Sequence, residues 1–245
     1  ALIDVLCVED LAADPRLIPS ALRRPATEVR HWAAEFPGQS AVVVCQRGLK
    51  LSQGAAAWLR QEGVAAEVLE GGHEAWAAAG KTPVPEAKLP PRDERGRTVW
   101  VTRARPKIDR LACPWLIRRF LDPRAVFLFV APSEVLAVAE RFGATPFDLE
   151  DVFWSHRGER CTFDTMIEEF ALDLEPLQRL AAIVRGADTA RLDLAPEAAG
   201  LGLSRMYADD LEQLEAAMLL YDAFYRWCRD AVDEPHSWPA RKREA

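Results

Sequence analysis

Short apolar runs alternate with longer amphipathic stretches over roughly the first third of the chain. Strands are expected at residues 1–6, 41–45 and 65–70, where apolar residues are continuous or alternate with polar ones. Helices are expected at residues 27–36, 51–63 and 73–80, where apolar residues recur every three or four positions. This order of elements predicts βαβ units and an α/β domain with a parallel sheet flanked by helices.

The rest of the chain has a different pattern. A strand is expected at residues 98–103, a helix through residues 114–121 and a second strand at residues 125–130. Helical patterns then dominate, at residues 133–143, 162–171, 175–187 and 209–232. We therefore predict a second, mostly helical α+β domain.

A proline-rich, charged stretch lies between the two patterns. Residues 80–97 contain four prolines and no apolar period, which is typical of a linker. We place the first domain at residues 1–87, the linker at 88–96 and the second domain at 97–245.

Composition narrows the class of protein. No apolar run approaches the ~18–20 residues that cross a bilayer, so no membrane partner is expected. The five cysteines are widely spaced and form no CxxC pair, which indicates a reduced, cytoplasmic protein. A net charge of −7 makes nucleic acid an unlikely partner.

The first candidate site is a cysteine loop. Residues 42–44 form an apolar run, so Cys45 would lie at the carboxyl end of a buried strand, where α/β proteins bind ligands. A helix beginning near Leu51 or Ser52 would direct its N–H groups at the sulfur and stabilise a thiolate. Gly48 gives the loop conformational freedom, and Arg47 and Lys50 add positive charge. The alternative is a buried structural cysteine at a strand end.

These residues resemble the rhodanese family. The motifs are "LIDV" (2–5), "CQRGLK" (45–50), "AAAWLRQEG" (55–63) and "VLEGGHEAW" (68–76). The resemblance implies a sulfurtransferase in which Cys45 takes sulfur from thiosulfate or a similar anionic donor as a persulfide. A thiol or another thiophilic acceptor then receives the sulfur, and no cofactor is required. The implied cradle for the anion consists of Gln46, Arg47, Gly48, Leu49 and Lys50.

Loop length separates this interpretation from a phosphatase of related fold. Such phosphatases resemble the same pattern but carry an arginine six positions after the cysteine, where this chain has Leu51. The basic residue here is Lys50, five positions on, where sulfurtransferases carry theirs. Lys50 in place of the usual arginine, and Leu6 after "DV", are departures from the rhodanese pattern. His31 and His73 are interpreted as surface or structural groups, His73 as the cap of a helix.

The second domain has two candidate sites. Arg110, Arg118 and Arg119 could bind an oxyanion through bidentate contacts. Pro114 is expected in the first helical turn, which would make Cys113 the N-cap residue and acidify its thiol. Alternatively, Cys113 is a small buried group and the arginines are solvated or paired.

His156, Cys161 and Asp164 form the second of these sites. Their N, S and O donors suit zinc or another transition metal, although the spacing matches no standard motif. Asp164 and Glu168 are four residues apart and would share a helix face. Carboxylates on a helix face are usually just solvated, which is the alternative.

The second domain as a whole resembles the C-terminal domain of chromate-resistance proteins. The motifs are "RPKIDRLACPWLIRRFLDP" (105–123), "HRGERCTFD" (156–164), "IVRGAD" (183–188) and "YADDLEQLEAAMLLYDAFYRWC" (207–228). The resemblance implies a role in oxyanion stress, with chromate or a similar oxyanion as a possible ligand. Three hypotheses follow: a sulfurtransferase linked to chromate resistance, a non-catalytic chromate- or redox-responsive sensor, and a metal enzyme supplied with sulfur by the first domain.

Overall fold

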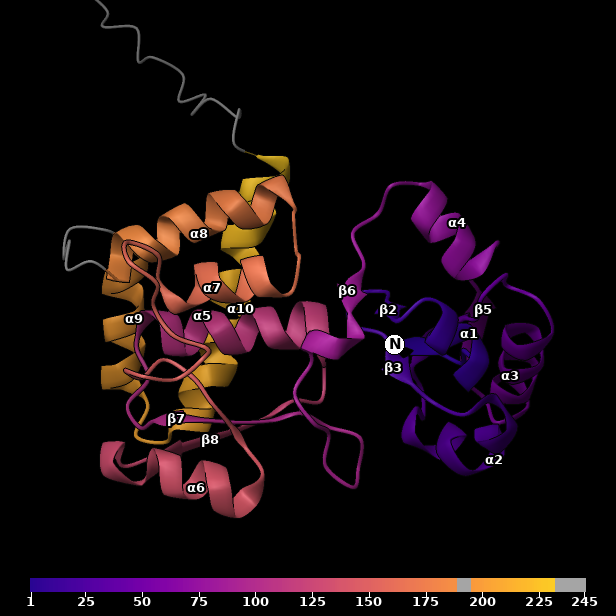
Figure 1. The fold of residues 1–245 in the computed structure, drawn as a ribbon, viewed down its shortest axis with the longest axis horizontal. Coiled ribbons are helices and arrows are strands. Elements are labelled where there is room, and N and C mark those ends of the chain that lie inside the picture. The colour runs from indigo at the N-terminus through magenta and orange to yellow at the C-terminus, as the bar shows by residue number, and fades with distance from the viewer. Residues whose placement is uncertain (189–194, 232–245) are drawn as a thin grey trace, which may run out of the picture.

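The first part of the molecule is built on a parallel four-stranded sheet. The computed structural model describes residues 1–188 and 195–231, coloured along the chain in Figure 1. The strand order is β3-β1-β4-β5, with all pairs parallel. These strands are β1 (Leu2–Asp4), β3 (Leu22–Arg23), β4 (Ser40–Val44) and β5 (Ala65–Val68).

Short helices surround this sheet. They are α1 (Val8–Ala13), α2 (Val29–Trp32, flanked by the 3-10 turns Ala26–Glu28 and Ala33–Glu35), α3 (Lys50–Gln61) and α4 (Gly72–Ala78). Ile3 and Val43 from the strands pack with Trp32 and Leu59 from the helices in one apolar core. The predicted α/β class is therefore confirmed, whereas α1 was not expected from the sequence.

The stretch interpreted as a linker contains ordered structure. Within it, β6 (Val84–Pro85) pairs antiparallel with β2 (Arg16–Leu17), and a 3-10 turn follows at Glu86–Lys88. Val84 is buried against the core of the second part. The placement of the linker at residues 88–96 stays a prediction.

The second part contains a parallel three-stranded sheet, ordered β8-β7-β9. Its strands are β7 (Val99–Arg103), β8 (Val126–Val130) and β9 (Thr145–Pro146). Helix α6 (Val135–Phe142) covers one face, where Val135 packs against Val101. The opposite face, with Trp100 and Phe127, joins a larger core made with the remaining helices (Figure 1).

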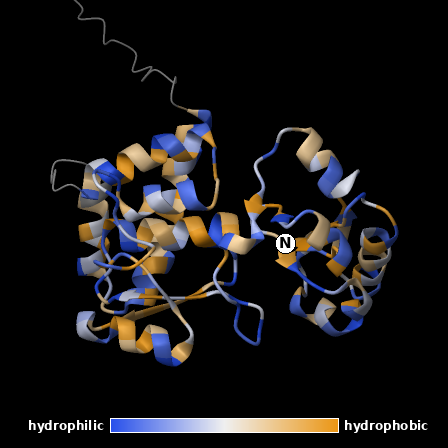
Figure 2. Ribbon diagram, viewed as in Figure 1, coloured by the Kyte–Doolittle hydropathy of each residue, from blue (hydrophilic) through white to orange (hydrophobic). Residues whose placement is uncertain are grey.

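The helices of the larger core are α5 (Ile108–Leu116, continued by a π-helical turn at Ile117–Leu121), α7 (Thr162–Glu169), α8 (Glu175–Asp188), α9 (Ala195–Met206) and α10 (Asp210–Asp230). Helix α5 runs through the middle of this group, and its hydrophobic positions are visible in Figure 2. The predicted mostly helical α+β second part is confirmed. Among residues 1–188 and 195–231, none of these helices combines the length and the apolar character that a bilayer crossing requires.

Helix α5 begins earlier than the sequence predicted. Pro114 lies inside the helix, not in its first turn, and the N-cap residue is Lys107, not Cys113. A proline inside a helix costs about 3 kcal/mol or more. Burial of nearly every side chain from Ile108 to Leu116 offsets this cost, because each fully buried large apolar side chain contributes about 1.5–3 kcal/mol.

Candidate functional site

Cys45 lies at the carboxyl end of β4, an interior strand of the first sheet, as the sequence predicted. The chain turns through residues 45–49, and α3 begins at Lys50, one residue before the expected start. The Cys45 side chain is buried, and its Sγ lies 3.1 Å from the Ser52 Oγ in the first turn of α3.

Glycines allow a second loop to pack tightly against this one. Gly48 has φ +68°, and a Cβ there would lie 2.6 Å from the Leu69 carbonyl oxygen. A Cβ on Gly72 would lie 2.0 Å from the Cys45 carbonyl oxygen. That oxygen instead accepts a hydrogen bond of 3.1 Å from the His73 N–H. Gly48 and Gly72 are therefore both needed for the close contact between the cysteine loop and the start of α4.

The surroundings of Cys45 favour its thiolate. Burial alone would raise the pKa of the Cys45 thiol. Hydrogen bonds from the Ser52 hydroxyl and from the backbone N–H groups of Ser52, Arg47 and Leu49 outweigh burial, so the pKa lies below its ordinary value of 9.0. A thiolate, not a thiol, is the nucleophilic form of cysteine.

A pocket of about 720 Å³ opens at Cys45. Its lining comes from the cysteine loop and from α1 with its N-cap: Cys7, Glu9, Asp10, Cys45, Gln46, Arg47, Leu49, Lys50 and Leu51. Arg47 is largely exposed and pairs with Glu74 at 3.0 Å. Of the predicted cradle, Gln46, Arg47, Leu49 and Lys50 line the pocket and Gly48 does not. Their role in binding an anion stays a prediction. Glu9 and Asp10 add negative charge that the sequence analysis did not anticipate.

Neither His31 nor His73 is among the residues that line this pocket. His73 lies within α4, whose N-cap is Gly71, so its expected role as the cap is wrong. Its Nε2 instead lies 2.8 Å from the Oδ2 of Asp4, a carboxylate that is fully buried. This contact ties α4 to the end of β1. His31 is exposed on α2, as expected of a surface group.

The predicted oxyanion residues of the second part are paired with carboxylates. Arg118 contacts Glu215 at 2.5 Å and Arg119 contacts Asp222 at 2.7 Å, so both fasten the α5 segment to α10. The Nε of Arg110 lies 3.3 Å from Asp148.

Cys113 is completely buried, and burial raises the pKa of its thiol well above the ordinary value. The expected acidic thiol at a helix N-cap is therefore wrong, because Cys113 lies in the second turn of α5 among apolar neighbours.

The predicted metal residues are divided between two clusters. Cys161 is the N-cap residue of α7, and its Sγ lies 3.3 Å from the Oδ2 of Asp164 in a capping box. His156 faces different carboxylates: its Nε2 lies 3.3 Å from Asp109, 3.3 Å from Asp148 and 3.4 Å from Asp188.

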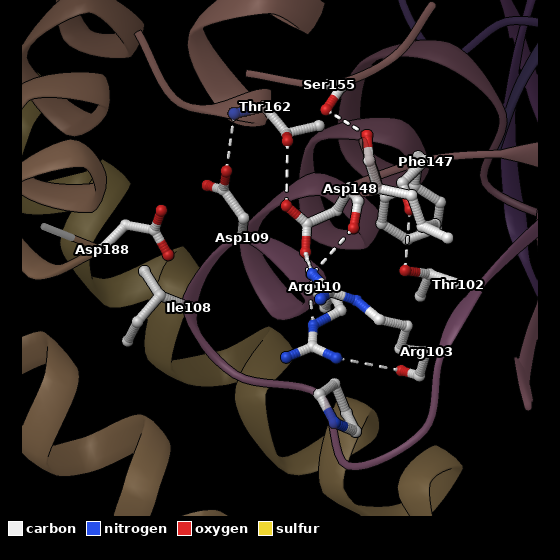
Figure 3. A network of polar contacts seen from close by, with 12 residues as sticks. Thr102, Arg103, Ile108, Asp109, Arg110, Phe147, Asp148, Ser155, Thr162 and Asp188 are labelled. Carbon is white, nitrogen blue, oxygen red and sulfur yellow. Dashed lines mark hydrogen bonds and ion pairs between the residues drawn. The ribbon is translucent and has the colours of Figure 1, made fainter. Parts of the chain in front are cut away.

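The His156 cluster joins residues that are far apart in the chain. Asp109 comes from the first turn of α5, Asp148 from just after β9 and Asp188 from the end of α8. Figure 3 shows the three carboxylates converging, with Thr162 bonded to Asp109 and to Asp148.

The ionisable groups of this cluster shift one another's pKa values. The neighbouring carboxylates of Asp109 and Asp148 raise the pKa of His156 to about 10. Burial, together with the neighbouring Asp109, raises the pKa of Asp188 to about 6. The pKa of Asp148 is lowered instead, because His156 and Arg110 outweigh the effect of its burial. Sequence analysis missed all three carboxylates.

The chain is similar to solved structures over about a third of its length. A rhodanese-like domain protein from Staphylococcus aureus is 28% identical, with 31% of this chain and 72% of that chain covered and a TM-score of 0.28. A rhodanese-related protein from Thermoplasma volcanium is 26% identical, with 35% and 84% covered and a TM-score of 0.32.

The chain is also similar to a curated protein and to a family model. Protein ChrB of Cupriavidus metallidurans is 32% identical over 147 residues, which are 58% of this chain and 41% of that protein. The chain therefore spans less than half the length of this relative. The model of the ChrB C-terminal domain matches residues 100–228. Since that match covers more than half of the sequence, the chain belongs to the ChrB C-terminal domain family.

Proposed function

We propose that the chain is a rhodanese-type sulfurtransferase whose nucleophile is Cys45. The observation that carries the proposal is the environment of its sulfur. The Ser52 hydroxyl and three backbone N–H groups stabilise the thiolate at the wall of an accessible pocket. A thiolate held by fixed donors is the expected form of a cysteine in covalent catalysis.

The proposed reaction has two steps, transfer of sulfur from the donor to Cys45 and transfer from Cys45 to the acceptor. The Cys45 thiolate attacks the outer sulfur of thiosulfate, the S–S bond of the donor breaks, and sulfite leaves with the bonding electron pair. The enzyme then carries a Cys45 persulfide. An acceptor thiolate attacks the outer sulfur of that persulfide and regenerates the Cys45 thiolate. The loop N–H groups can stabilise negative charge on either sulfur as it develops.

The charges around the pocket set requirements for the donor. Arg47 and Lys50 favour an anion, and the backbone of residues 46–50 supplies the cradle. Glu9 and Asp10 line the same pocket and disfavour a highly charged anionic donor. We propose that thiosulfate or a similar small anion is the donor and that a thiol of the reducing cytoplasm is the acceptor.

The resemblance of residues 97–231 to chromate-resistance proteins supports a role for this chemistry in resistance to chromate or related oxyanions. Sulfane sulfur transfer would supply reduced sulfur under oxyanion stress. This connection rests on the family and not on the geometry of Cys45.

The acidic wall of the pocket also favours a second candidate function. In this alternative the domain is a non-catalytic sensor, and Cys45 is modified by a chromate- or redox-linked signal without turnover. The two candidates differ in one property: only the enzyme passes sulfur repeatedly from donor to acceptor.

Transfer of sulfur from thiosulfate to cyanide, combined with intact mass spectrometry, tests the proposal. Thiosulfate should add one sulfur atom, roughly 32 Da, and cyanide should remove it with continuous formation of thiocyanate. Cys45→Ala should lose both signals. Cys7→Ser is the matched control, because Cys7 lines the same pocket but lies outside the cysteine loop.

The mass adduct and the turnover together separate the candidates. An adduct on Cys45 without thiocyanate formation supports the sensor, and loss of activity in Cys7→Ser but not in Cys45→Ala assigns the chemistry to the wrong cysteine. Absence of both signals in the wild type, with thiosulfate and with a persulfide donor, contradicts the enzyme.

A further inference from the structure

Asp109, Asp148 and His156 bring ligand atoms close together in the second part of the molecule. One donor atom from each lies within 4.8 Å of the others, and Asp109 and Asp148 are buried. From this geometry we propose that the three residues bind a divalent transition-metal ion, with Asp188 available as a fourth ligand. The proposal is independent of the chemistry at Cys45.

The distances suit a metal ion better than hydrogen bonds. The His156 Nε2 lies 3.3 Å from an oxygen of Asp109, 3.3 Å from one of Asp148 and 3.4 Å from one of Asp188. Ligand atoms ~2.0–2.1 Å from a tetrahedral zinc ion are roughly 3.3–3.4 Å apart. Charge-assisted hydrogen bonds are shorter, about 2.7–2.9 Å, and a single N–H cannot be directed at three oxygens.

Asp109 provides an independent sign of a missing partner. Its side chain is 2% exposed, its Oδ2 accepts the Thr162 N–H at 2.6 Å, and its Oδ1 has no hydrogen-bond partner among the described residues. In Figure 3 this second oxygen faces Asp188. A buried carboxylate oxygen without a partner is costly, and an ion that Asp109 bound through both of its oxygens would remove that cost.

The nearby arginines contact only one of the three carboxylates. Arg103 and Arg110 both contact Asp148, at 3.1 and 3.3 Å. The ion pairs of Asp109 and Asp188 within the described part of the chain are made with His156. Asp109 and Asp188 therefore have no arginine in ion-pair contact among the described residues, and a divalent ion bound to a neutral His156 would supply their counter-charge.

Surrounding groups hold the ligands in place. The Thr162 hydroxyl donates to Asp148 at 3.0 Å while the Thr162 N–H donates to Asp109. Both carboxylates are thus oriented by one residue in the first turn of α7. Such outer contacts are typical of metal sites, where they fix ligand orientation and contribute to affinity.

The donors indicate the class of ion. Carboxylate oxygens with one imidazole suit Mn²⁺, Fe²⁺ or Zn²⁺, whereas a thiolate-selective ion would need a cysteine ligand. Cys161 instead contacts Asp164. The His156 side chain is 45% exposed, so solvent or an added ligand can reach the ion. The sequence prediction of a metal at His156 is retained in this proposal, with Asp109 and Asp148 in place of Cys161 and Asp164.

The test is metal binding by the untagged full chain, since a histidine tag would bind the same ions. After treatment with chelator, the protein is titrated separately with Mn²⁺ and Zn²⁺, and bound metal is measured by mass spectrometry after gel filtration. Co²⁺ absorption reports the ligand geometry. We expect about one ion per chain and at least a tenfold loss of affinity in His156→Gln and in Asp109→Asn.

Controls separate this site from other binding. His31→Gln removes an exposed histidine elsewhere and should leave affinity unchanged. His156→Gln alters an exposed side chain and should fold normally, so it keeps the test valid if Asp109→Asn unfolds. Absence of saturable binding by either ion, or equal binding in His156→Gln, overturns the proposal. Binding of sulfate that depends on His156, without binding of a cation, also overturns it and identifies an anion site.

Discussion

Cys45 and Cys161 occupy similar positions in the two parts of the molecule, yet their thiols differ. Both are buried and both lie close to the first turn of a helix, α3 for Cys45 and α7 for Cys161. The pKa of Cys45 is lowered, whereas burial and the nearby Asp109 raise the pKa of Cys161 well above its ordinary value.

The difference lies in what faces each sulfur. The Ser52 hydroxyl and three backbone N–H groups point at Cys45. The Asp164 carboxylate accepts the Cys161 N–H and lies 3.3 Å from its sulfur. A position at a helix N-terminus is therefore not enough to activate a thiol. The donors must be aimed at the sulfur, and carboxylates must be kept away from it.

Alkylation by iodoacetamide should show the largest difference between the two cysteines. A thiolate reacts and a thiol does not, so Cys45 should be modified on the order of a thousandfold faster than Cys161 at pH 7. The rate at Cys45 should rise with pH and level off below pH 9, because its pKa is lowered from 9.0. Peptide mass spectrometry of the native protein over pH 5–10 gives both rates.

Cys7 is the internal control for accessibility in that experiment. It lines the same pocket as Cys45. A hydrogen bond from the Asp10 backbone N–H lowers the pKa of Cys7, but the side chains of Asp10 and Glu9 together with burial outweigh it, so the pKa lies above its ordinary value. Its rate should therefore keep rising above pH 9. Equal labelling of Cys45 and Cys161, or identical pH profiles for Cys45 and Cys7, would contradict the electrostatic explanation.

Gly72→Ala should cause the next largest effect, a loss of stability that originates at the cysteine loop. The new Cβ would meet the Cys45 carbonyl oxygen at 2.0 Å, so one of the two loops must move. We expect a loss of more than about 3 kcal/mol in the free energy of unfolding, from backbone strain and overpacking together. Chemical denaturation measures this loss.

Gly38→Ala is the matched control for backbone conformation. Gly38 also has a positive φ, +68°, but a Cβ there meets nothing within 4 Å. The left-handed backbone alone should cost about 1–2 kcal/mol. Equal destabilisation by the two substitutions would show that the contact between the loops contributes nothing.

Local patterns predicted the cysteine loop well because its parts are adjacent in sequence. A strand, a cysteine, a glycine and the start of a helix follow one another from Val44 to Lys50, and each has a local signal. The pocket wall formed by Glu9 and Asp10 had no such signal, because only the pairing of β1 with β4 brings them near Cys45.

The His156 cluster could not be predicted in the same way. Asp109, Asp148 and Asp188 are separated by about 40 residues each, and only tertiary packing brings them to His156. One signal was present: Asp109, like Arg110 beside it, is a charged residue in a helical pattern at residues 108–117 that is otherwise apolar. The proline in that pattern instead favoured a helix start near Cys113, because local propensity does not register burial of the whole helix.

Ser52→Ala should have a moderate effect on the reactivity of Cys45. It removes the hydroxyl that lies 3.1 Å from the sulfur. Since a hydrogen bond to a charged group contributes about 1.5–3 kcal/mol, the thiolate fraction and the alkylation rate at pH 7 should fall at least about tenfold. Ser40→Ala, at the exposed start of β4, should leave the rate unchanged. An unchanged rate in Ser52→Ala would assign the lowered pKa to the backbone alone.

Arg47→Ala should have the smallest effect, and only on binding of the donor. The Arg47 and Glu74 side chains are 69% and 51% exposed, so water screens their ion pair and Tm should stay the same. Arg47 lines the pocket together with the carboxylates of α1, so KM for thiosulfate should rise severalfold with kcat nearly constant. Glu9→Gln should shift KM in the opposite direction, and Arg47→Lys should restore most of the affinity.

Both shifts in KM should shrink as salt shortens the Debye length from about 10 Å at 0.1 M to about 3 Å at 1 M. A change in kcat instead of KM would mean that Arg47 acts on the sulfur transfer itself, and the reactivity of Cys45 could then no longer be attributed to Ser52 and the loop backbone alone.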